Sequence, residues 1–286
     1  MNKQKVQLGV TLPFSYYLDR DAASATPLLR FPSPNMIRQY VQALIREIAL
    51  WEDVRDEVAI SALRFTCGYL HLIKPDGLKE LLETLHRVFD IEPGCEITAL
   101  SCPGPYLDAH ADILKAYGIK LILDIPTFCQ KEAQECMLPY GPGINSLSFA
   151  DMRDSVLGVR TFQRTDVRSD QMLEEHIQKL LSLRPPRIEV TGFHADDCGM
   201  SGSDVLRPRL LAAGYREVER NTYAIDGGDL RYRADISSSE AFIGLGLNAL
   251  TRFDGTLTRN TDDFKRYLQV SCDPAQLYVR QETDAQ

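Results

Sequence analysis

One loop of this sequence concentrates side chains that could do chemistry. In TGFHADDCGMSG, at residues 191–202, His194, Asp196, Asp197 and Cys198 lie between glycines. In an extended loop, residues two positions apart point to one side, so His194 and Asp196 are suited to general acid–base catalysis or to binding a divalent metal. The alternative is that His194 is a hydrogen-bonded residue at the rim and that the aspartates cap a short helix.

A second loop with reactive groups follows the first apolar strand, in LGVTLPFSYYLDRDAASA at residues 8–25. The strand itself alternates apolar and polar positions, as a half-buried strand does. The loop then carries hydroxyl, phenol, carboxylate and guanidinium groups, on Ser15, Tyr16, Tyr17, Asp19 and Arg20. The tyrosines and Asp19 either line a pocket for a polar or aromatic substrate or fill an empty space, and the sequence leaves both interpretations open.

Composition limits the class of protein. The chain has 286 residues, 44% of them hydrophobic, which is enough for a full-sized core. A net charge of −8 without a cluster of lysines and arginines argues against a nucleic-acid partner. No apolar run has the length of a membrane span or the form of a secretory signal, so we expect a cytoplasmic protein without a membrane partner. The seven cysteines lack regular spacing, which is typical of a reducing compartment.

Short apolar runs alternate with helical patterns along the first two thirds of the chain. The predicted strands are 6–13, 58–67, 95–102, 120–126, 156–162 and 187–193, and the predicted helices are 35–51, 76–89, 106–118 and 170–183. Six successive β-α repeats predict a parallel sheet with right-handed crossovers. In the helix at 35–51, apolar residues share one face, and Arg38, Arg46 and Glu47 lie largely off it.

The regular alternation stops twice. Residues 128–150 are rich in proline and glycine, and we predict an irregular segment there. After residue 200, a helix that ends at Gly214, an extended segment and a last helix near Asp262 predict a small α+β appendage. We therefore predict two domains, 1–200 and 201–286.

The order and spacing of several stretches resemble the oxygen-independent coproporphyrinogen III oxidase family of radical SAM enzymes. The stretches are the first strand with its LPF, then YVQALIREI, FTCGYLHLIKPDGLKELLETLHRVFDIEPGCEIT, LLAAGYREVERNTYA and FIGLGLNALTRFDGTLTRN. The resemblance is clearest over 6–103 and 205–270 and implies an α/β fold, a partial parallel (β/α)6 barrel with the small C-terminal appendage. It also explains the glycines of GLGLNAL, at 244–250, by packing of the C-terminal segment.

The chain departs from this family where the family binds its cofactors. Ser15, Asp19 and Ala22 correspond to the three cysteines of the family's Cys-x3-Cys-x2-Cys motif. A hydroxyl, a carboxylate and a methyl group cannot replace three thiolates, so we expect no [4Fe-4S] cluster. Only Gly68 keeps the glycine character of the family's SAM-binding segment, and Leu100 stands at an acidic contact position. We therefore expect neither SAM binding nor any other cofactor, and assign no metal ligands.

In parallel barrels, functional groups lie where strands end at their carboxyl side. We predict His194, Asp196, Asp19 and Tyr16 as catalytic residues. The predicted substrate-binding residues are Ser15, Tyr17, Arg20, Cys67, Tyr69, His71, Cys102, Asp124 and Arg160. For His71, which lies between two leucines, the alternative is a partly buried histidine with satisfied hydrogen bonds.

Two classes of function fit these residues. The first is an enzyme of lyase, isomerase or cyclase type that uses non-radical acid–base chemistry on a small organic molecule in a biosynthetic pathway. The second is a catalytically inactive pseudoenzyme that binds a tetrapyrrole or SAM-like ligand, or that pairs with an active radical SAM relative. The density of polar loop residues favours the first. Both classes imply a small-molecule ligand, and both are compatible with a homodimer or with a heteromer containing a radical SAM relative.

Overall fold

The computed structural model of the chain describes residues 3–15, 29–30, 32–101, 109–125, 156–163, 170–192, 202–225 and 241–283. The chain divides into two compact units. Unit 1 comprises Met1–Leu100, Ala109–Ile119 and Arg231–Gln286, and unit 2 comprises Ser101–Asp108 and Lys120–Leu230. Within the described ranges, no helix combines the length and the apolar character that crossing a membrane requires.

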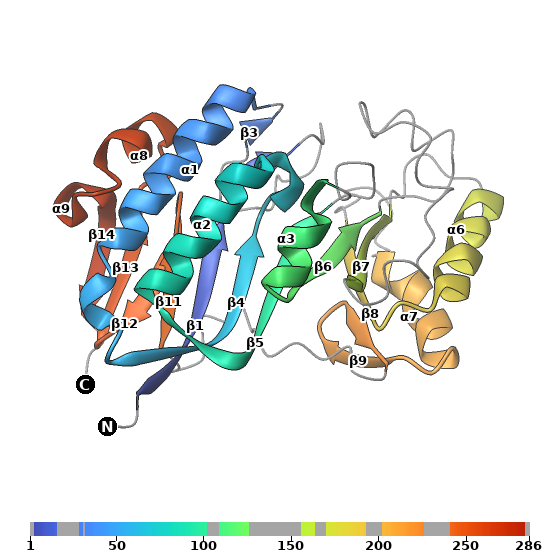
Figure 1. Cartoon of the computed structure of the whole chain (residues 1–286). Coiled ribbons are helices and arrows are strands. Elements are labelled where there is room, and N and C mark those ends of the chain that lie inside the picture. The colour runs from blue at the N-terminus through green and yellow to red at the C-terminus, as the bar shows by residue number, and fades with distance from the viewer. Residues whose placement is uncertain are drawn as a thin grey trace. The chain divides into compact units, whose positions relative to one another are not determined.

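Unit 1 is built on a sheet with the strand order β14-β13-β12-β11-β1-β4-β5 (Figure 1). The strands are β1 (Gln4–Thr11), β4 (Val58–Thr66), β5 (Asp90–Ser101), β11 (Phe242–Leu245), β12 (Leu250–Phe253), β13 (Thr256–Asn260) and β14 (Tyr278–Thr283). β1 pairs in parallel with β4 and β11, and β4 pairs in parallel with β5. The last strands, β11 to β14, are antiparallel neighbours. The parallel centre confirms the interpretation of the β-α repeats.

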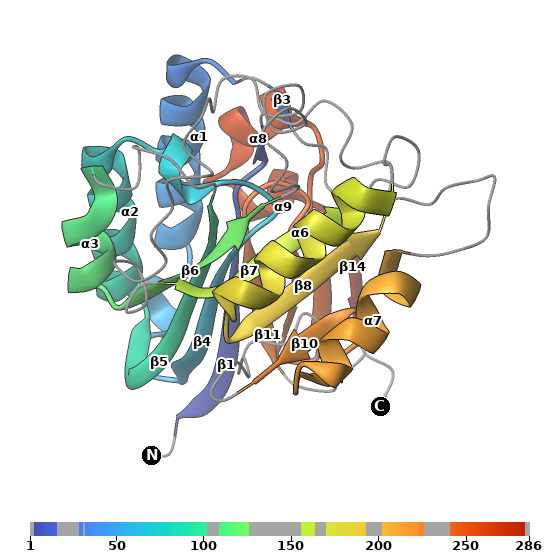
Figure 2. The same cartoon turned by 90° about the vertical axis from the view of Figure 1, so that its right-hand side faces the viewer.

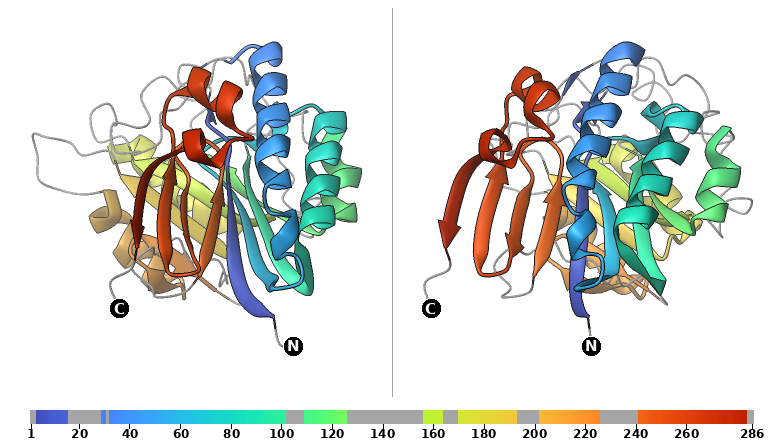
Figure 3. Two further views of the ribbon diagram at one scale, coloured as in Figure 1. Left: turned by 90° about the vertical axis from the view of Figure 1, so that its left-hand side faces the viewer. Right: turned by 60° about the vertical axis from the view of Figure 1, so that its left-hand side comes forward.

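Helices of unit 1 cover one face of this sheet. They are α1 (Pro34–Ala49), α2 (Pro75–Val88), α3 (Ala111–Ala116), α8 (Phe264–Val270) and α9 (Pro274–Leu277), with 3-10 turns at Glu52–Val54 and Leu70–Leu72. Figures 1 and 3 show α1, α2 and α3 side by side against the strands. α1 begins after Ser33, whose Oγ accepts a hydrogen bond from the backbone N–H of Met36, and Pro34 fits the first turn.

The register of the strands separates an apolar face from a polar one. Two rows across the sheet are apolar and almost fully buried: Ile243, Leu8, Leu63 and Ile97, and Leu245, Val10, Phe65 and Ala99. Side chains alternate between the two faces of a sheet, and these rows supply the apolar surface that the helices need. The rows between them therefore lie on the opposite face: Phe242, Gln7, Ala62 and Glu96, and Gly244, Gly9, Arg64 and Thr98. These last two rows are called the polar face.

Unit 2 contains a smaller sheet with the order β6-β7-β8-β10-β9. Its elements are β6 (Ile119–Asp124), β7 (Val156–Gln163), α6 (Asp170–Leu183), β8 (Arg187–Gly192), α7 (Gly202–Ala212), β9 (Arg216–Glu219) and β10 (Thr222–Ala224). β6, β7 and β8 are parallel, and β8, β10 and β9 are antiparallel neighbours. Figure 2 shows α6 running along β7 and β8. A row of buried apolar residues marks the covered face: Leu123, Val159, Ile188 and Tyr223.

The elements predicted from sequence agree with the structure, with two differences in length. β5 begins at Asp90, whereas the prediction began at residue 95, because Pro93 and Gly94 are typical of a turn. The strand continues through them because its pairing with β4 is irregular there: Ile60 pairs with Ile91, and Ala62 pairs with Glu96. α3 spans Ala111–Ala116 of the predicted 106–118, of which 106–108 lie outside the described residues. The predicted irregular segment at 128–150 lies outside the described residues.

Candidate functional site

The predicted site residues fall into three groups. Those outside the described residues are Tyr16, Tyr17, Asp19, Arg20, Ala22, Cys102, His194, Asp196, Asp197 and Cys198. For Ser15 and Arg160 the structure describes the backbone: Ser15 ends β2 (Phe14–Ser15), which pairs with β3 (Leu29–Arg30), and Arg160 lies in β7. Cys67, Tyr69, His71 and Asp124 are described with their surroundings.

The exit of β4 is held tightly against the exit of β1. The backbone N–H of Leu12 donates to Thr66 O at 2.9 Å, and that of Tyr69 donates to Phe14 O at 3.2 Å. A Cβ atom at Gly68 would lie 2.1 Å from Leu12 O and 2.4 Å from Phe14 O. Only glycine fits such an approach of backbone to backbone. Gly68 thus makes room for the chain that leaves β1.

Cys67 turns the chain between β4 and Gly68. Its φ of 71° lies in the left-handed region, which non-glycine residues rarely adopt. The residue is half-buried, and its thiol is not part of a disulfide. Cys67 therefore lies at the strand end where it was predicted, in a backbone conformation that the packing of Gly68 imposes on its neighbour.

Tyr69 and His71 are buried in unit 1. They are 1% and 6% exposed, and their rings stack with centroids 5.6 Å apart. Burial lowers the pKa of His71 to about 3, and the nearby His110 contributes in the same direction. His110 is itself buried, with Nε2 2.7 Å from Ile73 O. His71 is therefore neutral at physiological pH, which fits its interpretation as a buried histidine better than a role as a proton carrier.

The polar face of unit 1 carries ionisable groups inside a parallel sheet. Arg64 on β4 and Glu96 on β5 are half-buried and lie on adjacent rows. Thr98, directly beside Arg64 in register, is 0% exposed, and its Oγ1 has no hydrogen-bond partner within the described part of the chain. Buried hydroxyls in native proteins nearly always have a partner. This face therefore carries an ionic group of each sign and a hydroxyl that has no partner among the described residues.

Unit 2 has a charged row of its own. Asp124, at the end of β6, is in register with Arg160 on β7, which is in register with Glu189 on β8. Asp124 is 0% exposed. Two residues before Glu189, the buried Arg187 places Nε 3.0 Å from Glu189 Oε1. The register thus brings Asp124 and Arg160, both predicted from sequence, to neighbouring strand positions.

A second ionisable cluster lies beneath α1. Glu47, which was predicted to lie off the apolar face of this helix, is 2% exposed. Its carboxylate accepts hydrogen bonds from Tyr267 Oη at 2.5 Å, Asn260 Nδ2 at 2.6 Å and the backbone N–H of Gly246 at 2.8 Å. Burial raises the pKa of Glu47 to about 7, against the effect of these three donors.

The Glu47 cluster explains the second glycine of GLGLNAL. Gly246 has a φ of 103°, and a Cβ atom there would lie 2.5 Å from Tyr40 Oη. Tyr40 donates its hydroxyl hydrogen to Thr11 O at 2.7 Å and accepts a hydrogen bond from the backbone N–H of Leu247 at 3.0 Å. This glycine is thus required by close packing, as the resemblance implied for the segment, and the cluster joins α1 to the C-terminal part of unit 1.

Sequence reasoning did not single out Arg64, Glu96 and Thr98 as site residues. A signal was present in the sequence. Arg64 is a charged residue within the mostly apolar strand VAISALRFT, and the two-residue period of a strand places it on the same face as Ala62 and Thr66. Parallel strands that are covered on both faces are nearly continuous apolar runs. A charged residue in the middle of such a strand therefore indicates a face that is not filled by apolar side chains.

Two positions that the resemblance assigned to cofactor binding, Gly68 and Leu100, lie within the described part of the chain. No group of three or more His, Cys, Asp and Glu side chains in these ranges could hold a metal ion. The space beside Gly68 is filled by backbone atoms of Leu12 and Phe14. Leu100, at the acidic position of the third-strand motif, is an apolar residue that is 4% exposed.

Comparison with known proteins assigns the fold. No protein-family model and no curated protein matches the chain. Among solved structures, the chain has the α/β fold of radical SAM enzymes, with its mainly parallel sheet. It is similar to coproporphyrinogen III oxidase from Escherichia coli, a radical SAM enzyme, with a TM-score of 0.78 and 15% identity, covering 98% of this chain and 72% of that one. At this identity the likeness establishes the fold alone.

A weaker similarity is found with a second solved structure. The chain matches SuiB from Streptococcus suis, determined with S-adenosylmethionine bound, with a TM-score of 0.42 and 13% identity, over 74% of this chain and 44% of that one. This second match carries no argument, and it is the similarity to coproporphyrinogen III oxidase that confirms, at the level of the fold alone, the resemblance that the sequence suggested.

Proposed function

We propose that the chain is a radical SAM-fold protein that has lost the [4Fe-4S] cluster and performs non-radical acid–base chemistry on a small organic molecule. The observation that carries this proposal is the polar face of unit 1, where Thr98 Oγ1 is buried without a partner among the described residues. An unsatisfied buried hydroxyl costs about 1–3 kcal/mol of stability. A ligand that hydrogen-bonds to Thr98 Oγ1 would offset this cost.

Loss of the cluster is supported by the residue types at its expected positions. Ser15, Asp19 and Ala22 stand where the family has three cysteines. The backbone contacts around Gly68 and the burial of Leu100 support the same conclusion for SAM. The protein would then need no cofactor, and its reaction would have to proceed by proton transfer and electrostatic stabilisation.

The substrate in this proposal is a small polar molecule with ionisable groups. Arg64 and Glu96 on the polar face are suited to a carboxylate and an ammonium or hydroxyl group, respectively. His194, Asp196, Asp19 and Tyr16 remain the proposed acid–base residues, because imidazole, carboxylate and phenol groups can each move a proton. The protein would act in the cytoplasm, with no nucleic acid or membrane as a partner.

Substitution of Thr98 by valine tests the ligand. Valine has the shape of threonine without the hydroxyl, so T98V should raise the free energy of unfolding by about 1–2 kcal/mol. The same change should remove a hydrogen bond to the bound molecule. Native mass spectrometry of the purified protein, incubated with a mixture of amino acids and hydroxy acids, should show a retained molecule for the wild type and weaker retention for T98V.

The outcomes of this experiment are distinct. T98S keeps the hydroxyl and should retain the molecule as the wild type does. Equal retention by T98V and the wild type, or no retention by either, would contradict a ligand at the polar face. Once a retained molecule is known, its turnover by the wild type and by D19N and H194A would test the acid–base residues directly.

The absence of the cluster is a separate prediction. Protein purified under strict anoxia should be colourless and should contain no stoichiometric iron or sulfide, because three soft ligands are missing. An absorption band near about 400 nm with about four irons and four sulfides per chain would contradict this prediction. Stoichiometric zinc or manganese would instead point to His194 and its neighbouring aspartates as metal ligands.

A pseudoenzyme is the second candidate, and the burial of Tyr69, Leu70 and His71 favours it. These side chains are at most 6% exposed, so they fill space at the end of β4. Such a protein would bind a tetrapyrrole or SAM-like ligand, or would pair with an active radical SAM relative, without turnover. Titration with S-adenosylmethionine and with coproporphyrin III, followed by calorimetry, distinguishes the two candidates: saturable binding of either without chemical change would favour the pseudoenzyme.

A further inference from the structure

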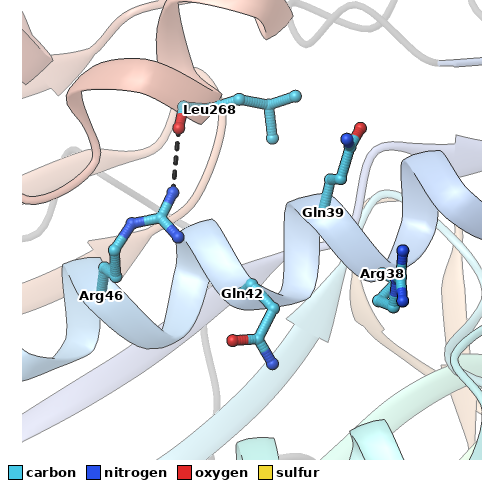
Figure 4. A pocket seen from close by; sticks show the side chains of 5 residues that line it. All are labelled: Arg38, Gln39, Gln42, Arg46 and Leu268. Carbon is cyan, nitrogen blue, oxygen red and sulfur yellow. Dashed lines mark hydrogen bonds between the residues drawn. The ribbon is translucent and has the colours of Figure 1, made fainter.

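A groove lined by the ends of polar side chains and by their apolar stems runs along α1 on the outer surface of unit 1. It has a volume of about 480 Å³ and is lined by Arg38, Gln39, Gln42 and Arg46 of α1 and by Leu268 of α8. Figure 4 shows the four α1 side chains along one stretch of the helix, with Leu268 beside them. All four α1 side chains end in guanidinium or amide groups, which are rich in N–H donors. The groove is therefore suited to acceptor groups.

Among the described residues, neither arginine of the groove has a carboxylate that neutralises its positive charge. Arg38 donates to Asn35 Oδ1 at 2.8 Å and Arg46 donates to Leu268 O at 2.9 Å, and both acceptors are neutral. No carboxylate of the described residues forms an ion pair with either arginine. Other exposed cations do have such partners: Lys3 with Asp90, Lys79 with Glu83, Arg87 with Glu52 and Arg209 with Glu174.

The neutral contacts hold the guanidinium groups in place without cancelling their charge. Glu80 is the carboxylate that reaches the groove, and its Oε2 accepts a hydrogen bond from Gln42 Nε2 at 3.0 Å. Because each guanidinium has five N–H donors, both arginines retain donors for a bidentate contact with a carboxylate. Two arginines without an ion-pair partner in the described part of the chain, in a protein of net charge −8, make this groove a local positive site.

We infer that the groove along α1 docks an acidic segment of a partner protein. Arg38 and Arg46 are eight positions apart, which corresponds to about 12 Å along a helix. An extended segment covers that distance in about four residues, so its carboxylates would be about four residues apart. Leu268 offers an apolar contact between the two arginines. A second copy of this chain fits less well, because two molecules of net charge −8 repel each other.

This inference does not depend on the proposed function. The groove lies on the helix-covered side of the unit 1 sheet, whereas the proposed ligand contacts the polar face. Loss of peptide binding at the groove would leave ligand binding at the polar face unchanged. Both kinds of binding can be tested on the same purified protein.

Fluorescence anisotropy with a labelled peptide tests the docking. The peptide carries glutamates at the spacing derived above with leucines between them, and its analogue carries glutamines instead. The wild type should bind the glutamate peptide, and R38E/R46E should weaken binding by roughly tenfold or more at about 0.1 M salt. R38Q/R46Q removes the two charges but keeps polar side chains, so it should lose less affinity than R38E/R46E. It replaces the reversal variant in the test if that variant folds poorly.

The matched control changes the same charge elsewhere. K115E/K179E reverses two exposed lysines outside the groove and should leave affinity within about twofold of the wild type. Equal binding of the glutamate and glutamine peptides, or an equal loss in K115E/K179E, would overturn the inference. Tighter binding of a labelled single-stranded RNA than of the glutamate peptide would also overturn it, in favour of a phosphate-bearing partner.

Discussion

Replacing Glu47 by glutamine should remove a pH dependence from the stability of the fold. Burial raises the pKa of Glu47 from 4.5 to about 7. Because the folded-state pKa is the higher one, the stabilising contribution of this group is fully present below about pH 4.5 and is lost as the pH rises through 7. A difference of this size corresponds to about 3 kcal/mol. The free energy of unfolding of the wild type, relative to E47Q, should therefore fall by about 3 kcal/mol between pH 4.5 and 8.

Chemical denaturation at several pH values measures this difference. E47Q also loses one of the acceptor oxygens that serve Tyr267, Asn260 and Gly246, so it should be less stable than the wild type at pH 4.5, and this deficit should shrink as the pH rises through 7. Y267F provides a second test. It removes a donor that lowers the pKa of Glu47, so the fall in the free energy of unfolding should occur at a higher pH than in the wild type. The control is E83Q, at an exposed carboxylate, which should change the pH profile by less than about 0.5 kcal/mol. A pH-independent difference between the wild type and E47Q would contradict the prediction.

The strands and helices could be predicted because their apolar periods are local. The alternation of Leu8 and Val10 in β1, and the helical spacing of Ile37, Val41 and Leu44 in α1, each determine an element without knowledge of its neighbours. β5 was predicted too short for a related reason. Pro93 and Gly94 favour a turn locally, and only the shifted register against β4 lets the strand pass through them.

The buried polar residues could not be predicted, because their environment depends on distant parts of the chain. Glu47 lies at the edge of the apolar face of α1, and its donors come from residues 246, 260 and 267. A helical wheel places such a glutamate in solvent. Asp124 and Arg160 could be singled out because both lie near the carboxyl ends of predicted parallel strands, and the register then places them side by side. His194 and Asp196, in a loop rich in glycine, lie outside the described residues and stay a prediction.

Alanine at position 68 should destabilise unit 1 strongly. The added Cβ would lie 2.1 Å from Leu12 O, 2.4 Å from Phe14 O and 2.7 Å from Phe14 N. All three atoms belong to the backbone, so no side-chain rotation can relieve the overlap. The exit of β1 would have to move away from β4 and would lose the hydrogen bond from Tyr69 N to Phe14 O. We expect G68A to lower the free energy of unfolding by about 3 kcal/mol.

Gly77 provides a matched control in the same unit. It lies within α2, where a Cβ would make only an ordinary contact of 3.5 Å with Ile73 Cγ2. Alanine there should raise the free energy of unfolding by up to about 1 kcal/mol, since it favours the helix and restricts the unfolded chain. Opposite signs for G68A and G77A in thermal or chemical denaturation would establish that Gly68 is needed for backbone packing. If G68A were as stable as the wild type, the space beside residue 68 would be open, and the close packing of the backbone at Leu12 and Phe14 against Gly68 would be contradicted.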